Sequence, residues 1–245
     1  MDVVTRLATP EDVDFLARMM ERSMRPVQGR GLFDELAAVL EMERLDFHKA
    51  VLLAGASNWG QLEDYIIAEY KGQPASASSA HLSNMPDIRP MTMAQVQALS
   101  TYLGLPADKA KALLRAFIKK FGIFGDLPHL RHPAEYVLEY GGVMPEFEGR
   151  SLPGYVIGAH IKRAIEKGCK TLGIVTLVGN NLALSSFSRY GLVHHSTISA
   201  DDVGGDFFGT HRLVLDLTNL PEGYEPGQPL EPMRRRGRAG VSGAS

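Results

Sequence analysis

The first forty residues alternate between strand-like and helix-like patterns of apolar positions. Residues 3–7 predict a short strand, and Thr9 is a suitable cap for the helix that follows, with Pro10 at its first position. The apolar positions of that helix recur every three or four residues, at Val13, Leu16, Met19 and Met20. A second helix is predicted from residue 32. The apolar segment that continues to residue 56 has poor periodicity and predicts no regular element.

Residues 64–133 begin with a hairpin and then change character. Residues 64–70 and 75–82 predict two strands joined by a turn at 71–74. The second strand consists largely of small residues, which allow another group to approach the sheet closely. Residues 92–103 and 106–121 then predict two helices. We therefore expect residues 83–133 to form a helical insertion between two strands.

Residues 134–143 return to a strand pattern. Alternation places two sets on opposite faces, one with Tyr136, Leu138 and Tyr140 and the other with Glu135, Val137 and Glu139. The pair Gly141-Gly142 at its end indicates a bulge or a close backbone approach.

The rest of the chain predicts a helix at 153–168, a strand at 171–178, a short helix and two final strands. The 171–178 strand is apolar on both faces, as expected for the centre of a sheet. Asn180 or Asn181 caps the short helix, and Gly191 ends it. The final strands are predicted at 193–198 and 212–217. The whole order predicts an α/β (α+β) fold, with a mixed, mostly antiparallel sheet flanked by helices.

The last residues differ in composition from the rest. From Pro221 the chain is rich in Pro, Gly and Glu, and it then contains Arg234-Arg235-Arg236-Gly237-Arg238. We expect one domain over residues 1–220 and a disordered tail over 221–245. The arginine run could contact phosphates or acidic partners, although a solvated tail is the simpler interpretation.

Composition narrows the function classes. The 245 residues carry a formal net charge of −2, which gives no overall attraction to nucleic acid. The single cysteine, Cys169, cannot form an internal disulfide and fits a reducing compartment. The N-terminus has no signal-peptide pattern, and no apolar run is long enough to cross a bilayer. We predict a cytoplasmic protein without nucleic-acid or membrane partners; a homodimer is left open.

The most informative stretch is Val143 to Leu192. A strand, a turn and a helix follow one another there, an arrangement that exposes backbone N–H groups at a helix N-terminus and can bind phosphate. The stretch contains Val143-Met144-Pro145, the turn at 148–153, Asn180 to Ala183, Phe187 and Gly191-Leu192. This order of motifs resembles the GNAT superfamily of acyl-CoA-dependent N-acetyltransferases. The resemblance covers residues 3–217 except the insertion.

The resemblance implies acetyl-CoA as co-substrate. The residues it implies for cofactor binding are Gly142, Val143, Glu148, Gly149, Arg150, Ser151, Leu152, Pro153, Gly154, Asn180, Asn181 and Phe187. Four of them depart from the family pattern. Glu148 replaces Gln or Arg, Ser151 and Pro153 replace glycines, and Phe187 replaces a tyrosine. Pro153 lacks an N–H, and Glu148 would repel a pyrophosphate unless it turns outward or Arg150 offsets it.

The resemblance also suggests catalytic roles. An alkyl ammonium has a pKa near ~10, so a base must remove its proton before attack. Glu139 is the candidate base, with Glu135 on the same face as the alternative. The Val143 N–H is the expected donor to the thioester oxygen. Tyr190, one turn from Phe187, is the candidate acid for the leaving thiolate.

These features predict transfer of an acetyl group from acetyl-CoA directly to a primary amine of a small molecule. Asp201, Asp202 and Asp206 favour a cationic acceptor on charge alone. His81 could face the substrate, and we predict no metal site, because His129 and His132 have no acidic or thiol partner. Two alternatives remain: a GNAT-like acyl-CoA-binding or protein-interaction module with weak or no turnover, and an acyltransferase for longer acyl-CoA. A nucleotide-binding α/β fold ranks last, because no glycine-rich nucleotide motif is present.

Overall fold

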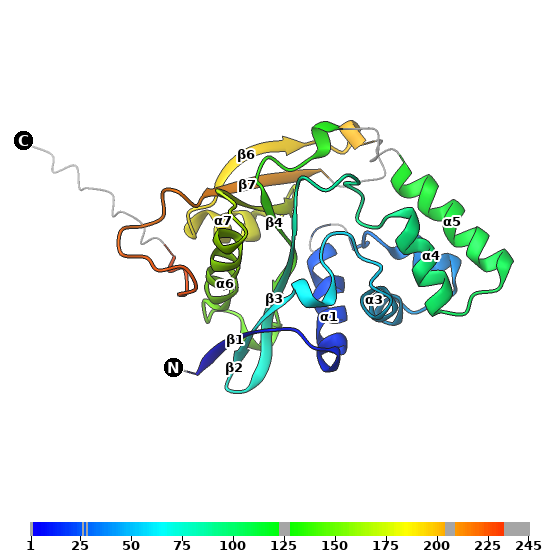
Figure 1. The fold of residues 1–245 in the computed structure, drawn as a ribbon, viewed down its shortest axis with the longest axis horizontal. Coiled ribbons are helices and arrows are strands. Elements are labelled where there is room, and N and C mark those ends of the chain that lie inside the picture. The colour runs from blue at the N-terminus through cyan, green and yellow to red at the C-terminus, as the bar shows by residue number, and fades with distance from the viewer. Residues whose placement is uncertain (1, 26, 28, 123–127, 204–208, 233–245) are drawn as a thin grey trace, which may run out of the picture.

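The computed structural model describes residues 2–25, 27, 29–122, 128–203 and 209–232. Figure 1 shows the arrangement of the elements. The strands are β1 (Val3–Leu7), β2 (Ile66–Tyr70), β3 (Gln73–Leu82), β4 (Tyr136–Val143), β5 (Thr171–Leu177), β6 (Val193–Ile198) and β7 (Thr210–Asp216). The helices are α1 (Val13–Met24), α2 (Asp34–Val39), α3 (Arg44–Leu53), α4 (Met93–Tyr102), α5 (Ala107–Phe121), α6 (Leu152–Glu166) and α7 (Asn181–Arg189).

The described strands form one seven-stranded sheet in the order β1-β2-β3-β4-β5-β7-β6. Neighbouring strands are antiparallel except β4 and β5, which run parallel. The predicted mixed, mostly antiparallel sheet flanked by helices is therefore confirmed. The parallel pair is at the centre of the sheet, and α6 is the crossover that connects its two strands.

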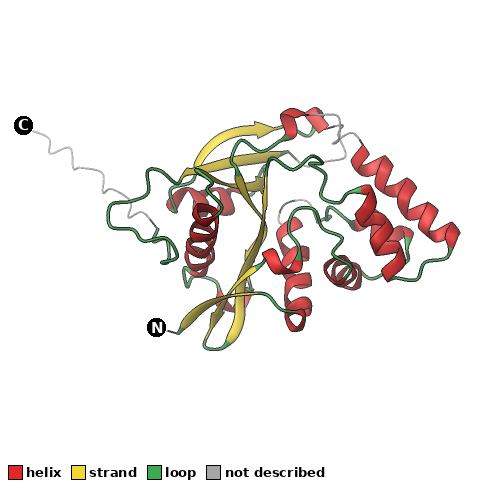
Figure 2. Cartoon of the chain, in the orientation of Figure 1, coloured by secondary structure: helices red, strands yellow, loops and turns green. Residues whose placement is uncertain are grey.

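Helices cover both faces of the sheet (Figure 2). On one face α6 packs mainly against β2 and β3, and it also contacts β1, β4 and β5. Its apolar side forms a core cluster with Leu138, Leu172 and Leu213. On the other face α1 lies against β3 and β4. One hydrophobic core therefore lies on each face of the sheet, and packing on both faces fixes the positions of β4 and β5.

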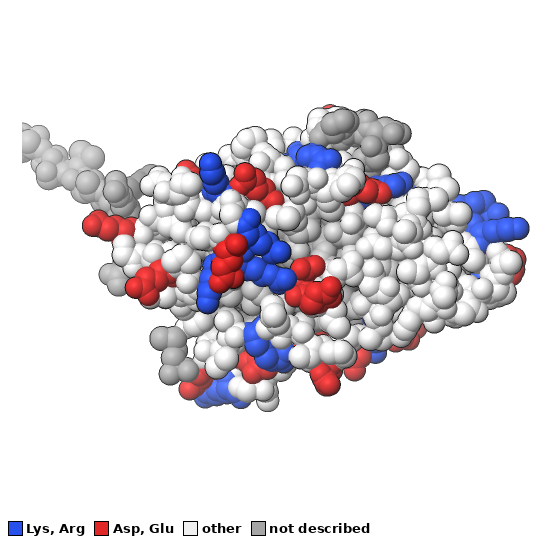
Figure 3. Space-filling model, in the orientation of Figure 1, with Lys and Arg blue, Asp and Glu red and all other residues white. Residues whose placement is uncertain are grey.

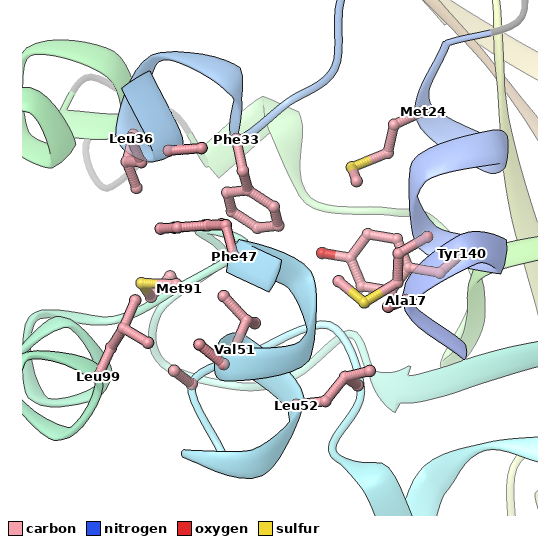
Figure 4. Packing of buried hydrophobic residues seen from close by; sticks show 14 of the residues in the cluster. Ala17, Met24, Phe33, Leu36, Phe47, Val51, Leu52, Met91, Leu99 and Tyr140 are labelled. Carbon is pink, nitrogen blue, oxygen red and sulfur yellow. The ribbon is translucent and has the colours of Figure 1, made fainter. Parts of the chain in front are cut away.

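The helical insertion between β3 and β4 is part of the larger core. Helix α5 packs on α2, and α4 packs on α3. The ring of Phe33 lies 6.0 Å from that of Phe121 and 6.1 Å from that of Phe47, measured between ring centroids. Figure 4 shows Phe33, Phe47, Met91 and Leu99 meeting between these helices. The insertion extends the hydrophobic core and is not a separate appendage.

Helix α3 had no sequence prediction, and the structure gives the reason. Phe47, Ala50, Val51 and Leu52 are all buried, so its apolar residues do not lie along one stripe. The helix is enclosed by α1, α2 and α4. A helix that is buried on several sides loses the periodicity on which the sequence prediction depends.

Strand β4 contains the bulge that the two glycines indicated. Ala77 pairs with Gly142 and Ser79 pairs with Glu139, so Ser78 alone faces both Tyr140 and Gly141. Tyr140 has a left-handed backbone with φ of 51°. The bulge turns its side chain into the core on the α1 side, beside Ala17, as Figure 4 shows. The predicted common face of Tyr136, Leu138 and Tyr140 is therefore wrong for Tyr140.

The C-terminal strap, residues 221–232, packs along α6. The Leu230 N–H donates to the Gly154 carbonyl at 2.9 Å, and the Leu230 side chain is buried. The Gln228 carbonyl lies so close to Gly158 that an added Cβ would approach it to 1.9 Å. Residues 221–232, which fall in the segment predicted to be disordered, are thus described in contact with α6. Residues 233–245, with the arginine run, lie outside the described residues.

The surface in Figure 3 carries acidic and basic side chains mixed together, with no single-sign field on that face. The ion pairs of the described residues include that of Arg163 with Asp64 at 3.1 Å. Within the described ranges, the helices are all too short or too polar to cross a bilayer.

Candidate active site

The central strands separate along their length. β4 and β5 pair at only three positions, from Tyr136 opposite Leu172 to Leu138 opposite Ile174. Beyond these, β4 stays paired with β3 as far as Val143, and β5 stays paired with β7 as far as Leu177. The two halves of the sheet therefore diverge and leave an opening between them, which we call the splay.

Two hollows meet at the splay. The inner pocket encloses about 240 Å³ and is lined by β4, β5, β7 and the two flanks of the insertion. The outer groove, of about 1040 Å³, runs over the loop before α6. The residues that line both are Ser23, Leu138, Gly141, Ile174, Asn180, Ala183 and Phe187. A molecule in the outer groove could therefore reach the inner pocket through the splay.

The floor of the outer groove is rich in free backbone donors. The N–H groups of residues 149–152 have no hydrogen-bond acceptor within the described chain. Gly149 and Ser151 have left-handed backbones, with φ of 78° and 55°, which turn the chain into a concave loop. The dipole of α6 adds positive potential at this end. Backbone donors grouped in this way have the geometry that suits a phosphate group.

Pro153 occupies the first turn of α6, where its fixed φ suits the helix. The next N–H, that of Gly154, bonds to the Ser151 carbonyl at 3.1 Å. The proline therefore removes one donor, and the four donors before it remain available.

Glu148 and Arg150 point in different directions. The Glu148 carboxylate forms an ion pair with Arg22 of α1. Arg150 lies over the ring of Tyr70, 4.7 Å from the centroid, and donates to its hydroxyl at 3.3 Å. The idea that Arg150 offsets the charge of Glu148 is therefore wrong, because Arg22 does so.

Most residues predicted to bind the cofactor lie together. Those that line the outer groove are Gly142, Val143, Glu148, Gly149, Arg150, Ser151, Leu152, Pro153, Asn180 and Phe187. Gly154 and Asn181 are not among the lining residues. Gly154 is covered by the Leu230 carbonyl and the Tyr190 ring. Asn180 rather than Asn181 caps α7, because its side chain accepts from the Ala183 N–H at 3.2 Å.

Glu139 lies in the inner pocket. Its carboxylate has no hydrogen bond and no ion pair with any residue of the described ranges. Burial raises its pKa from 4.5 to about 8, and the more distant Arg212 opposes this shift. Such a carboxyl group can accept a proton near neutral pH. Glu135, the alternative, is exposed and bonds to the Lys170 N–H, away from both hollows.

Tyr190 is separated from Glu139. It lines the outer groove only, where its ring packs against Gly154 at the start of α6. Burial raises the pKa of its hydroxyl, while contacts with the Gly154 backbone and the Ser151 side chain lower it. Phe187, which cannot transfer a proton, lies at the junction between the two hollows.

The same architecture occurs in solved acetyltransferase structures. One protein described as an acetyltransferase is 17% identical, with a TM-score of 0.52, over 87% of this chain and 99% of its own. An N-acetyltransferase from Staphylococcus aureus Mu50 is 14% identical, with a TM-score of 0.54, over 86% of this chain and all (100%) of its own. A protein named SsHAT is 13% identical, with a TM-score of 0.55, over 89% and 100%. The chain has the GNAT acetyltransferase fold. No family model matches the sequence, and no curated protein matches it.

Within this GNAT fold, two histidines line the inner pocket. His81 stacks beside Trp59 with ring centroids 6.4 Å apart, and its buried Nδ1 has no partner in the described structure. The Nδ1 of His132 accepts from the Ala134 N–H at 3.0 Å. Burial lowers the pKa of His81 to about 3 and that of His132 to about 4. Both rings are therefore neutral near pH 7. The described residues contain no group of three potential metal ligands.

Two arginines of the inner pocket had no sequence prediction. Arg212 of β7 donates to the carbonyls of His129 at 3.0 Å and Arg131 at 3.1 Å, and also to that of Leu130. Arg131 donates to the Met85 carbonyl at 2.7 Å and to that of Ser83. The two guanidinium groups thus tie both flanks of the insertion to the GNAT sheet. Their positions depend on tertiary contacts, so no local sequence signal identifies them.

Of the acidic residues proposed to attract a cationic acceptor, the two that the structure describes do not line the inner pocket. Asp201 and Asp202 are exposed and do not line it. Asp202 instead accepts from the Ser199 N–H at 2.7 Å, within its own turn. Asp206 lies outside the described residues.

Proposed function

We propose that the protein transfers an acetyl group from acetyl-CoA directly to a primary amine of a small molecule. One observation carries this proposal. A groove floored by four unpaired N–H groups opens through the splay into a pocket that holds Glu139 with a pKa of about 8. The acetyltransferases with the same fold support it, although their low identity concerns the fold alone.

Residues 149–152 would hold the phosphates of acetyl-CoA, which supplies an acetyl thioester for the reaction. The positive end of α6 supports this role. Arg22 neutralises Glu148 and so reduces the repulsion that a carboxylate at the groove would exert on a pyrophosphate. Residues departing from the family pattern in this loop therefore remain compatible with phosphate binding.

The edge of β4 would orient the thioester. The Met144 N–H bonds to the Ala75 carbonyl of β3 at 2.9 Å. N–H groups of successive strand residues point to opposite sides, so the Val143 N–H points toward the splay. In this arrangement the Val143 N–H donates to the thioester oxygen as negative charge develops there.

Glu139 would accept the proton of the attacking amine. The amine nitrogen forms a bond to the carbonyl carbon, the carbon–sulfur bond breaks, and the amine proton passes to the carboxylate. The leaving thiolate takes a proton from water in this scheme, because Phe187 stands at the junction. That Tyr190 donates a proton to the leaving thiolate stays a prediction.

The test measures thiol release from acetyl-CoA across a panel of small amines, together with CoA binding by calorimetry. We expect CoA to bind and at least one amine to be acetylated. Glu139→Gln should reduce kcat by about 100-fold or more while the Kd for CoA stays the same. Glu166→Gln, an exposed change on α6, is the matched control. Absence of both CoA binding and thiol release would refute the proposal.

The activity should also depend on pH in a specified way. Because Glu139 must be ionised to accept a proton, kcat/KM should rise through an apparent pKa near 8 and then level off. A profile that is flat between pH 6 and 9 with the same amine would remove Glu139 from the mechanism.

A second function, acyl-CoA binding without turnover, is favoured by Phe187, because the junction offers no side-chain acid there. The same experiment separates the two. Tight CoA binding without thiol release, unchanged in Glu139→Gln, would select the binding module.

A further inference from the structure

The inner pocket contains more positive than negative charge. Its ionisable side chains with a fixed charge near pH 7 are Arg131 and Arg212. Glu139, the acidic residue lining it in the described structure, is largely protonated below about pH 8. The two histidines are neutral. Among the described residues, the lining of the pocket therefore presents two guanidinium groups and little negative charge.

Within the described residues, Glu139 is the carboxyl group whose charge acts on Arg212, and it forms no ion pair with either arginine. No ion pair involves Arg131 or Arg212, although the pocket-facing Arg212 residue is only 7% exposed. Their bonds go to backbone carbonyls, which accept hydrogen bonds but carry no net charge. A buried cation is costly without a counter-ion, and Glu139 can supply a negative charge near Arg212 only when it is ionised, so an anion that faces the two guanidinium groups would be stabilised here. The lowered pKa of Arg212, caused by burial, agrees with that cost.

From this arrangement we propose that the acceptor is a small amine that carries a carboxylate, such as an amino acid. Its carboxylate would face Arg131 and Arg212, and its amine would face Glu139. A ligand with only a positive charge would be repelled by the two guanidinium groups. A zwitterion instead places its carboxylate near the guanidinium groups and its amine near Glu139. The inference deepens the proposed function and rests on its assignment of the inner pocket to the acceptor.

The walls also set the size and character of the ligand. The pocket encloses about 240 Å³, below the range of about 300–1,000 Å³ typical of drug-sized ligand sites. The remaining lining is largely apolar and includes Met24, Leu32, Met85, Ile88, Leu130 and Ile198. We therefore expect an amino acid with an apolar side chain of moderate size to fit better than a polyamine.

The experiment compares matched ligands on the complete protein saturated with CoA. Calorimetry measures binding of leucine and methionine, of their amides, and of the corresponding amines without the carboxyl group. We expect at least one of the acids to bind about tenfold or more tightly than its amide and its amine. Equal or tighter binding of the amides or amines, or no binding by either acid, would overturn the inference. An aminoalkyl phosphate of similar size that binds more tightly than both acids would also overturn it.

Variants locate the effect. Arg131→Gln should remove most of the preference for acid over amide. Arg131→Lys should keep part of it, because lysine keeps the positive charge but lacks the planar guanidinium group that can form two parallel hydrogen bonds. Arg115→Gln, an exposed change on α5, should leave the preference intact. A preference that survives Arg131→Gln in full would contradict the assigned position of the carboxylate.

The outcome is separable from that of the proposed function. Binding of the acid without any acetyl transfer would refute the transferase and keep the carboxylate site. Efficient acetylation of amines without a carboxylate, with no gain for the acids, would keep the transferase and refute the carboxylate site.

Discussion

The protonation state of Glu139 affects both the proposed reaction and the stability of the fold, in opposite directions. Its raised pKa means that the folded protein binds a proton that the unfolded chain releases between about pH 4.5 and 8. The stability that this group contributes is therefore complete below pH 4.5 and is lost as the pH rises toward 8. The ionised form that the proposed reaction needs is the form that the fold disfavours.

Glu139→Gln should consequently stabilise the protein while it removes activity. The increase in Tm over the natural chain should be small at pH 5, grow up to about pH 8 and then remain constant. Thermal unfolding at several pH values measures this difference. An increase that does not change with pH would show that Glu139 is not the group that titrates, and Glu166→Gln provides the baseline.

Tyr190 allows a test between an acid and a packing role. Its ring lies against Gly154 and its hydroxyl near Ser151, so we expect Tyr190→Phe to weaken CoA binding and raise KM with little change in kcat. Steady-state kinetics with saturating amine separates the two parameters. A fall in kcat of tenfold or more at unchanged KM would instead establish Tyr190 as the proton donor.

At the scale of elements, the strap and α6 fit closely at Gly158. A Cβ there would come within 1.9 Å of the Gln228 carbonyl, which is backbone and cannot swing aside. Gly158→Ala should therefore displace the strap and lower stability by about 1–3 kcal/mol. Urea unfolding measures the change. Gly122→Ala, where an added Cβ meets only an ordinary contact at 3.7 Å, is the control and should be neutral.

Most elements followed from periodicity and turn chemistry, and the failures have identifiable causes. The Thr9-Pro10 start, the hairpin and the two insertion helices were predictable because local signals determine them. Helix α3 was not, because it is buried on several sides. The direction of the Tyr140 side chain was not predictable either, because one extra residue in a bulge reverses the face of every side chain after it.

At the scale of the whole molecule, the sequence predicted one half of the site. The loop at 148–153 and Glu139 are adjacent to recognisable motifs, so their positions could be anticipated. Arg131 and Arg212 come from the end of the insertion and from β7, and only the folded sheet brings them together. The expectation of a cationic acceptor rested on three aspartates, and the two that the structure describes, Asp201 and Asp202, do not line the inner pocket.

The strap makes the end of the described chain part of the outer groove. Pro232 lines the groove, and Leu230 is hydrogen-bonded to the first turn of α6, the same turn whose dipole faces the groove. A ligand that orders this turn also favours the docked strap, and the coupling must act equally in both directions.

Hydrogen–deuterium exchange at the Leu230 amide should slow when CoA is added, and Gly158→Ala should weaken CoA binding. An exchange rate at Leu230 that is the same with and without CoA would show that the two are energetically independent. Slower exchange at Leu230 with CoA would make this amide a reporter of whether the groove is filled.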